Sequence, residues 1–153
     1  MANKKASQTL KKADVIKATQ INEQTFEHWT DRRVIRLSGE DDPGDGRGKP
    51  RRFGMRTITK LAIAHRISLL GIPANMAVTL SSQFVDEPQR GRNIGCLFPT
   101  GRTILTATQD GAATIHNVQP DGDIDSILKT EAALVVDIGS IIENLHLRLN
   151  TIL

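Results

Sequence analysis

The first half of the chain carries apolar residues at the three-to-four spacing of helices. This spacing predicts a short helix at residues 13–18, a polar turn at 19–21 and a second helix that begins at Asn22. Asn22 is a suitable N-cap, because its side-chain oxygen can accept a hydrogen bond from a free N–H of the first turn. Two further helices are predicted at residues 55–70 and 73–84.

The second half of the chain changes to the alternation of strands. Strands are predicted at residues 93–98, 103–108 and 112–118. A hairpin turn at 99–102 joins the first two, and a second turn signal at 109–111 precedes the third. A buried strand at 132–138 and an amphipathic helix at 140–153 follow. One long dimerisation helix from residue 124 onward is the alternative, and an internal glycine and a β-branched pair count against it.

Changes in composition divide the chain into four segments. Residues 1–10 are polar and contain lysines, which predicts a flexible basic arm. Residues 11–85 contain the predicted helices, and 86–92 form a linker in which charge, proline and glycine replace the helical pattern. Residues 93–153 are expected to form a small α+β domain for oligomerisation or ligand binding.

The net charge of +3 hides an uneven distribution. Residues 1–92 carry 17 Lys and Arg against 10 Asp and Glu, a balance of +7, and the remaining residues have a balance of −4. A basic first part suggests a polyanionic partner such as nucleic acid, and an acidic protein is the alternative. Aromatic residues make up only 3% of the chain, which disfavours the stacking that single-strand binders use.

Cysteine usage and hydropathy favour a cytoplasmic protein. Cys96 is the only cysteine, so neither an intrachain disulfide nor a multi-cysteine metal site is expected. No apolar run approaches the ~18 residues that a membrane span needs, and no hydrophobic segment follows the first lysines.

The exposed side of the second predicted helix carries residue types that contact duplex DNA. Gln24 can make two hydrogen bonds with adenine, and Thr25 can reach a phosphate or a thymine methyl group. His28 lies one turn further along, whereas Trp29 is expected in the core. The cations at and beyond the helix end, which would meet backbone phosphates, are Arg32, Arg33 and Arg36.

A glycine-rich loop at residues 38–49 precedes a basic segment. The loop lacks phosphate-binding motifs and EF-hand spacing, so neither a nucleotide nor a metal is expected there. The cations at its end, which we expect to neutralise phosphates as a wing, are Arg47, Lys49, Arg51 and Arg52. Phe53 is expected in the core. The predicted fold class is therefore α+β, with a mainly helical winged helix-turn-helix followed by a small mixed domain.

The second half offers no recognisable catalytic set. His116 and His146 are isolated, and residues 121–125 are expected to form an acidic loop. Cys96 lies among apolar neighbours and is expected to be inert packing. The sequence therefore predicts neither an enzyme nor a cofactor, and it identifies no small-molecule effector.

Residues 13–84 resemble the winged helix-turn-helix of the mercury-resistance-regulator (MerR) family. The resemblance lies in the segment VIKATQINEQTFEHWTDRRVIR, in Arg51 shortly before Phe53, and in the Leu-Gly-Ile at residues 70–72. It implies binding as a homodimer to a two-fold related site in double-stranded DNA, with contacts at Gln24, Thr25, His28 and Arg51. The long antiparallel dimerisation helix and the cysteine metal loop of the family are not recognisable, so metal sensing is not carried over.

The sequence thus predicts a bacterial or phage transcriptional regulator. Its DNA-contacting residues are expected to be Asn22, Gln24, Thr25, His28, Arg32, Arg33, Arg47, Lys49, Arg51 and Arg52. The first alternative is an architectural, excisionase-like or phage packaging factor that uses the same fold. The second alternative is a protein-interaction module whose basic face meets an acidic partner.

Overall fold

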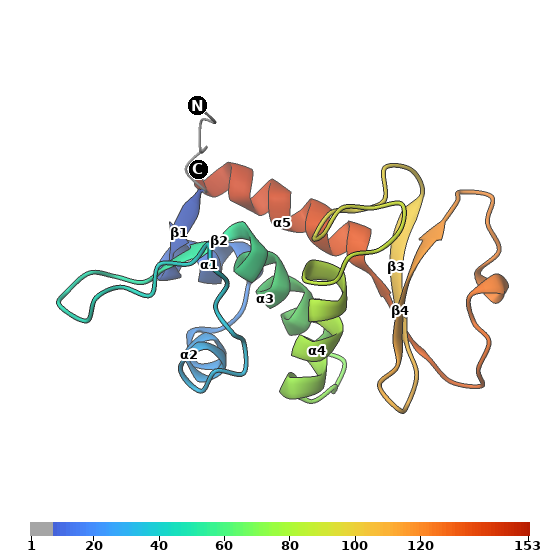
Figure 1. Ribbon diagram of the computed structural model, residues 1–153, viewed down its shortest axis with the longest axis horizontal. Coiled ribbons are helices and arrows are strands. Elements are labelled where there is room, and N and C mark those ends of the chain that lie inside the picture. Colours follow the sequence, from blue (N-terminus) through green and yellow to red (C-terminus); the bar gives the residue numbers. More distant parts are fainter. Residues whose placement is uncertain (1–7) are drawn as a thin grey trace.

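Five helices and two small antiparallel sheets form an α+β fold in the computed structural model, which describes residues 8–153 (Figure 1). The helices are α1 (Lys12–Thr19), α2 (Glu23–Asp31), α3 (Met55–Ser68), α4 (Ala74–Val85) and α5 (Ile138–Ile152). The strands are β1 (Thr9–Lys11), β2 (Arg52–Gly54), β3 (Arg102–Ala107), β4 (Ala113–Val118) and β5 (Leu134–Asp137). Among these residues no helix combines the length and apolar content that crossing a bilayer requires.

The first two helices have the predicted positions and share one core. The Asn22 side chain accepts a hydrogen bond of 2.7 Å from the Thr25 N–H, which confirms it as the N-cap of α2. Gln20 ends α1 in a left-handed conformation (φ 59°) and so turns the chain toward α2. Val15 and Phe26 are buried together, and the Phe26 ring meets Phe53 edge-on with 5.2 Å between centroids.

The predicted flexible arm is wrong for residues 9 and 10, and residues 1–7 lie outside the described part of the chain. Thr9 begins strand β1, which pairs with β2 so that Leu10 faces Phe53 across the sheet. Leu10 is buried because this cross-strand pair extends the core of the helices. Arg52 of β2 also forms an antiparallel β-bridge with Asp42.

Helices α3 and α4 confirm the predictions at 55–70 and 73–84, with ends shifted by one or two residues. Helix α3 is central, and even Lys60 on it is buried. The Lys60 ammonium donates to Asp86 at the end of α4, and Arg56 Nε donates to the same carboxylate at 2.9 Å. These two bonds hold the pKa of Asp86 below its usual value against the opposing effect of burial.

The three-stranded sheet has the order β4-β3-β5, and the predicted strand at 93–98 is wrong. Strand β3 already has β4 on one side and β5 on the other, so no edge of it is left for residues 93–98. The hairpin lies between β3 and β4, which confirms the turn predicted at 109–111 but not the hairpin predicted at 99–102. The Phe98 N–H instead donates to Thr103 Oγ1 at 3.0 Å, which keeps this segment outside the sheet.

The alternative of one long helix from residue 124 is also wrong. Strand β5 pairs with β3, and Asp137 then caps α5 by accepting a 3.1 Å hydrogen bond from the Ser140 N–H. Gly139, which lies between the predicted strand at 132–138 and the predicted helix at 140–153, is inside α5. The β-branched pair Val135-Val136 favours the strand, because such residues fit a pleated surface better than a helix.

Helix α5 returns from the three-stranded sheet to the end of the molecule that carries α1 (Figure 1). It packs against α1 and α3, and its Arg148 Nε donates to the Ala18 carbonyl at 2.6 Å. Apolar residues from both halves therefore belong to one core, among them Ile63 and Leu145.

Residues 86–92, predicted as a linker, contain a buried cation. The Arg92 guanidinium lies 4.6 Å from the centre of the Phe84 ring and donates to the Phe84 carbonyl at 3.0 Å and to Gln89 Oε1 at 2.9 Å. Only 8% of Arg92 is exposed. It closes the end of α4 and fixes the start of the loop that follows.

We expect acid to weaken the fold through His65 on α3. Burial, together with the charge of Arg66, lowers the pKa of His65 despite a hydrogen bond to the Gln20 backbone. Within residues 8–153, His65 Nδ1 is a buried side-chain atom without a hydrogen-bond partner. The pKa of His65 is lower in the folded state than in the unfolded state. The stability that neutral His65 contributes is therefore complete above the unfolded-state pKa, and it is lost as the pH falls from the unfolded-state pKa through the folded-state pKa.

The measurement is urea unfolding at pH 7.5 and at pH 5.5, for the wild type and for His65→Gln. The free energy of unfolding should fall with acid in the wild type, and less in the variant. His116→Gln, on β4, is the comparison that shows how much of the acid effect comes from a second histidine with a lowered pKa. An equal pH dependence in the wild type and His65→Gln would contradict the assignment.

Candidate nucleic-acid interface

Helix α2 presents a polar stripe opposite its buried side. Gln24, His28 and Arg32 are four residues apart, so their side chains lie in one row, and all three are exposed. Phe26 and Trp29 face the core with 2% and 3% of their surface exposed. Within residues 8–153, neither the Gln24 amide nor the His28 ring makes a side-chain hydrogen bond, and both are exposed to a ligand.

Two other predicted contact residues, Asn22 and Thr25, form the N-cap of α2. Asn22 is exposed, but its side-chain oxygen is the acceptor of the α2 cap. Thr25 supplies the N–H of that cap, and its side chain is half-buried. The structure thus places both at the N-terminal end of the stripe, where Asn22 fixes the helix and Thr25 forms part of its edge.

The acidic residues of α2 are neutralised by cations of neighbouring segments. Lys12 of α1 lies 2.7 Å from Glu23 and also donates to Glu27. The hydrogen bond to Glu23, and to a lesser extent the bond to Glu27, raises the pKa of Lys12. The bond between Lys12 and Glu23 also lowers the pKa of Glu23. Arg51 lies 2.8 Å from Asp31. The face of α2 therefore carries less net negative charge than its sequence suggests.

The predicted wing cations do not all face the same way. Lys49 pairs with Asp42 at 2.9 Å, and Arg51 with Asp31. Arg52 turns toward β1, where its guanidinium donates to Thr9 Oγ1 at 3.0 Å and to the Thr9 carbonyl at 2.8 Å. In the described chain no carboxylate lies within 4.0 Å of a second group of exposed cations, namely Arg32, Arg33, Arg36 and Arg47.

The loop between Asp42 and Arg52, called here the 43–51 loop, projects from the body beside α2 (Figure 1). Its base is fixed by Asp41, whose carboxylate accepts hydrogen bonds from the Gly54 N–H at 2.7 Å and the Thr57 hydroxyl at 2.5 Å. Gly44 has φ +73°, and a Cβ there would lie 2.5 Å from the Lys49 carbonyl oxygen. The anchoring role of Asp41 was not predicted, because an aspartate beside Asp42 in a glycine-rich loop gives no local signal of its distant partners Gly54 and Thr57.

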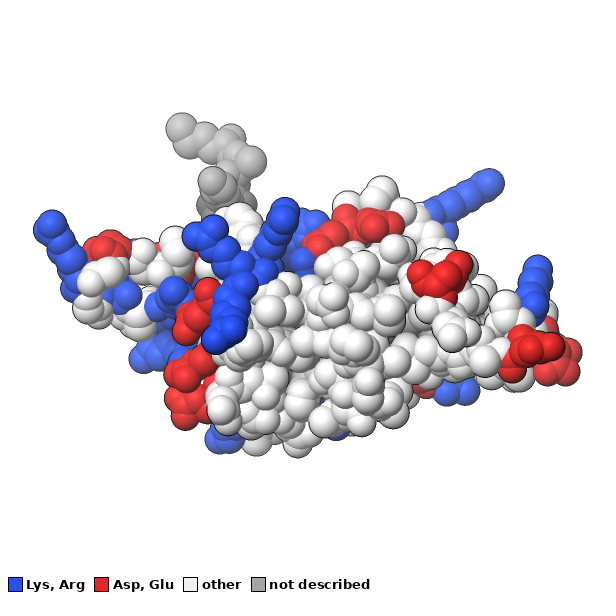
Figure 2. Space-filling view, turned by 90° about the horizontal axis from the view of Figure 1, so that it is seen from below, with Lys and Arg blue, Asp and Glu red and all other residues white. Residues whose placement is uncertain are grey.

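Charge is distributed unevenly over the face that carries α2. Figure 2 shows Lys and Arg gathered at the end of the molecule that bears α1, α2 and the 43–51 loop, with Asp and Glu among them. The middle of the same face is largely uncharged. A polyanion approaching this face would therefore meet its attraction at the α2 end.

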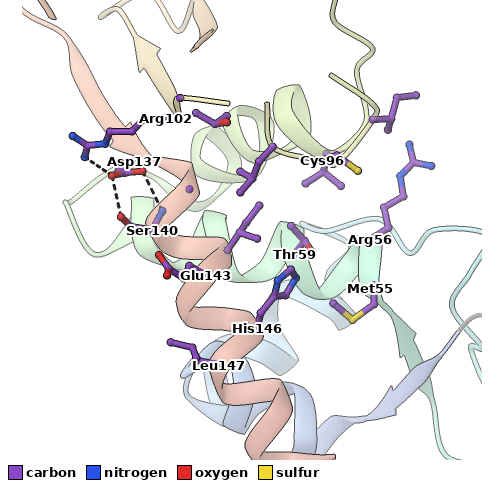
Figure 3. A pocket seen from close by; sticks show the side chains of 18 of the residues that line it. Met55, Arg56, Thr59, Cys96, Arg102, Asp137, Ser140, Glu143, His146 and Leu147 are labelled. Atoms are coloured by element: carbon purple, nitrogen blue, oxygen red, sulfur yellow. Dashed lines mark hydrogen bonds and ion pairs between the residues drawn. The ribbon is translucent and has the colours of Figure 1, made fainter. Parts of the chain in front are cut away.

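A large cavity lies away from this end, between α3, α5 and the loop before β3 (Figure 3). Cys96 lines it and is exposed, so the prediction that Cys96 is packed inertly is wrong. The reason is local: its carbonyl oxygen is 3.4 Å from Arg92 Nη1, and this contact turns the backbone inward. His146 lines the same cavity, whereas His116 is hydrogen-bonded to Thr106 at 2.8 Å.

The three aspartates at residues 121–125 lie in an acidic loop, as the sequence predicts. Asp123 caps a short 3-10 helix (Ile124–Ser126), and Asp121 and Asp125 are exposed. In the described part of the chain, no three His, Cys, Asp or Glu side chains gather as they would around a metal ion.

The polar stripe on α2 thus lies next to Arg33 and Arg36, exposed cations without a carboxylate partner among residues 8–153. When the sequence is compared with protein-family models and with curated proteins, nothing matches.

Proposed function

We propose that the protein is a cytoplasmic, sequence-specific double-stranded DNA-binding regulator of the winged helix-turn-helix type. One observation supports this most: the exposed row of Gln24, His28 and Arg32 on a helix whose start is fixed by a cap. In such proteins the second helix enters the major groove and its N-terminal residues contact base edges. Gln24 would pair with adenine, and Arg32 would contact a phosphate beyond it.

The ion pairs of α2 support the same proposal. Free carboxylates of Glu23, Glu27 and Asp31 would repel phosphates. Lys12 contacts the first two and Arg51 the third, so two cations offset part of this negative charge. Arg33, Arg36 and Arg47 then add charge that no described carboxylate offsets. Their place beside α2 suits contacts with the backbone on either side of the groove, with the 43–51 loop as the wing.

We further propose that the protein binds as a homodimer. Helix α2 has nine residues and is roughly 13 Å long, so one copy spans only about four base pairs of the groove. Two copies on half-sites about one helical turn apart would recognise a site of useful length. An architectural or packaging factor with the same fold would instead favour clustered direct repeats.

The test is selection of duplexes from a random pool, followed by anisotropy titration of the labelled winner at several salt concentrations. We expect saturable binding to a two-fold related site that weakens steeply with salt. Anisotropy of the labelled duplex is preferable to tryptophan emission, because Trp29 of α2 is buried in the hydrophobic core. Selection of direct repeats would favour the architectural role, and no binding at low salt would favour an acidic protein partner.

Gln24→Ala should relax base preference with little change in salt dependence. Gln24 carries no charge, and losing its two hydrogen bonds to a base would remove about 1–3 kcal/mol of discrimination at one position. The measurement is binding to the selected duplex and to single-position variants of it. Thr114→Ala, an exposed polar change on β4, is the control. If Gln24→Ala weakened all duplexes equally, α2 would not be the helix that contacts bases.

A further inference from the structure

The cavity beside α5 has the size and lining of a small-molecule site. Its volume is about 1100 Å³, slightly above the ~300–1,000 Å³ range of ligand pockets. Its walls come from α3, α5 and the loop before β3, so both halves of the chain contribute to it. Apolar side chains, among them Met55, Leu97 and Ile142, form much of the lining.

The cations of the cavity already have carboxylate partners. At one end Arg102 pairs with Asp137, which also accepts from Ser140 (Figure 3). At the other end Arg56 Nε lies 2.9 Å from Asp86 Oδ1. The carboxylates of Glu143 and Glu40 also line the cavity, and no cation of residues 8–153 lies within 4.0 Å of either.

Uncharged polar groups lie next to the unpaired carboxylate. Glu143 and His146 are three residues apart on α5 and so lie on one face of the helix. Figure 3 shows the His146 ring between α5 and α3, close to Thr59 and Met55. A ligand that reaches Glu143 would therefore have a hydrogen-bonding ring and an apolar wall along its body.

We propose that this cavity binds an amphipathic organic ammonium ion. The positive end contacts the Glu143 carboxylate, and the apolar body lies on Met55, Leu97 and Ile142. Glu143 is exposed at the wall of the cavity, so its carboxylate can contact the positive end from the water side, while burial of the apolar body supplies most of the affinity. An organic anion of the same shape would meet the free carboxylates and be repelled.

Helix α5 connects the cavity to α1. Helix α5 forms one wall, and its Arg148 is bonded to the last turn of α1 at the Ala18 carbonyl. A ligand that shifts α5 would alter this contact. Any effect on DNA binding rests on the proposed function, whereas binding of the ammonium ion does not.

The experiment is isothermal titration calorimetry of the full chain with octyltrimethylammonium and with octyl sulfate, both below micelle-forming concentrations. We expect one site for the cation, binding at least about tenfold tighter than the anion. Glu143→Gln should weaken cation binding by about tenfold or more, and Glu131→Gln, an exposed carboxylate outside the cavity, should not. Thermal unfolding checks that both variants are folded.

Three results would overturn the proposal: no saturable binding of the cation, equal affinity for the two probes, or unchanged affinity in Glu143→Gln. Repeating the duplex titration with and without octyltrimethylammonium then tests coupling. Calorimetric binding without any duplex binding would leave the cavity assignment standing and remove only the DNA-binding proposal.

Discussion

Replacing Arg32 and Arg36 together by alanine is expected to weaken duplex binding by about 60-fold at 0.1 M salt, because each phosphate contact contributes a factor of about eight through counterion release. Both side chains are exposed next to α2, and in the described chain neither has a carboxylate within 4.0 Å. Each is therefore free to release counterions when it meets a phosphate. The loss should be the same for all sequences.

The measurement is the salt dependence of binding by anisotropy. The slope of log affinity against log salt should become shallower by about two for the double variant. Arg90→Ala/Lys129→Ala is the matched control, since it also removes two exposed cations but leaves α2 and its surroundings untouched. If both double variants lost affinity equally, the interaction would reflect net charge alone, and the interface would not be at α2.

Arg92→Ala should lower the free energy of unfolding by about 3 kcal/mol, the magnitude of losing a buried, hydrogen-bonded charge. The substitution would leave the Phe84 carbonyl and Gln89 Oε1 without their donor and remove the guanidinium from the Phe84 ring. It would also remove the positive charge that faces the C-terminal end of α4, where the helix dipole favours a cation.

Urea denaturation of the variants measures this effect. Arg90→Ala, two residues earlier and exposed, is the control and should change stability by less than about 0.5 kcal/mol. Arg92→Lys should be intermediate, because lysine restores the charge but cannot reproduce the planar set of donors. A cost below about 1 kcal/mol for Arg92→Ala would mean that the loop after α4 is held by its other contacts.

The helices of the first half were predictable because their signals are local. The spacing of Val15, Ile21 and Phe26 and the cap at Asn22 are properties of neighbouring residues, and they fix α1 and α2 with little help from the rest of the chain. Strand β1 was missed because three residues are too short for a pattern, and its burial depends on Phe53, far along the chain.

The errors in the second half arise from competition between segments. Residues 93–98 alternate like a strand, yet β4 and β5 occupy both edges of β3, so these residues cannot pair with β3 as predicted. The return of α5 to α1 depends on a contact such as Arg148 to Ala18, which no local pattern indicates.

The candidate interface was predictable as a set of residue types but not as a pattern of pairing. Gln24, His28 and Arg32 follow from helical spacing alone. That Arg51 pairs with Asp31 and Arg52 with Thr9 depends on how β2 meets α2 and β1, which only the folded chain shows. The cavity beside α5 was invisible for the same reason, since its walls are distant in sequence.

The bond between Arg148 and Ala18 also has a consequence for the order of events during synthesis. The two residues are 130 positions apart, and at about 5–20 residues per second the ribosome needs on the order of ten seconds to make the second after the first. During that interval α1 lacks the helix that packs on it, so the apolar side of the helix pair stays open to chaperones or to misfolding. A nascent or prematurely terminated chain would carry every residue of the stripe on α2 and still lack the support that holds it in place. Completion of α5 would therefore supply the contact with α1 at the end of the molecule that also carries α2.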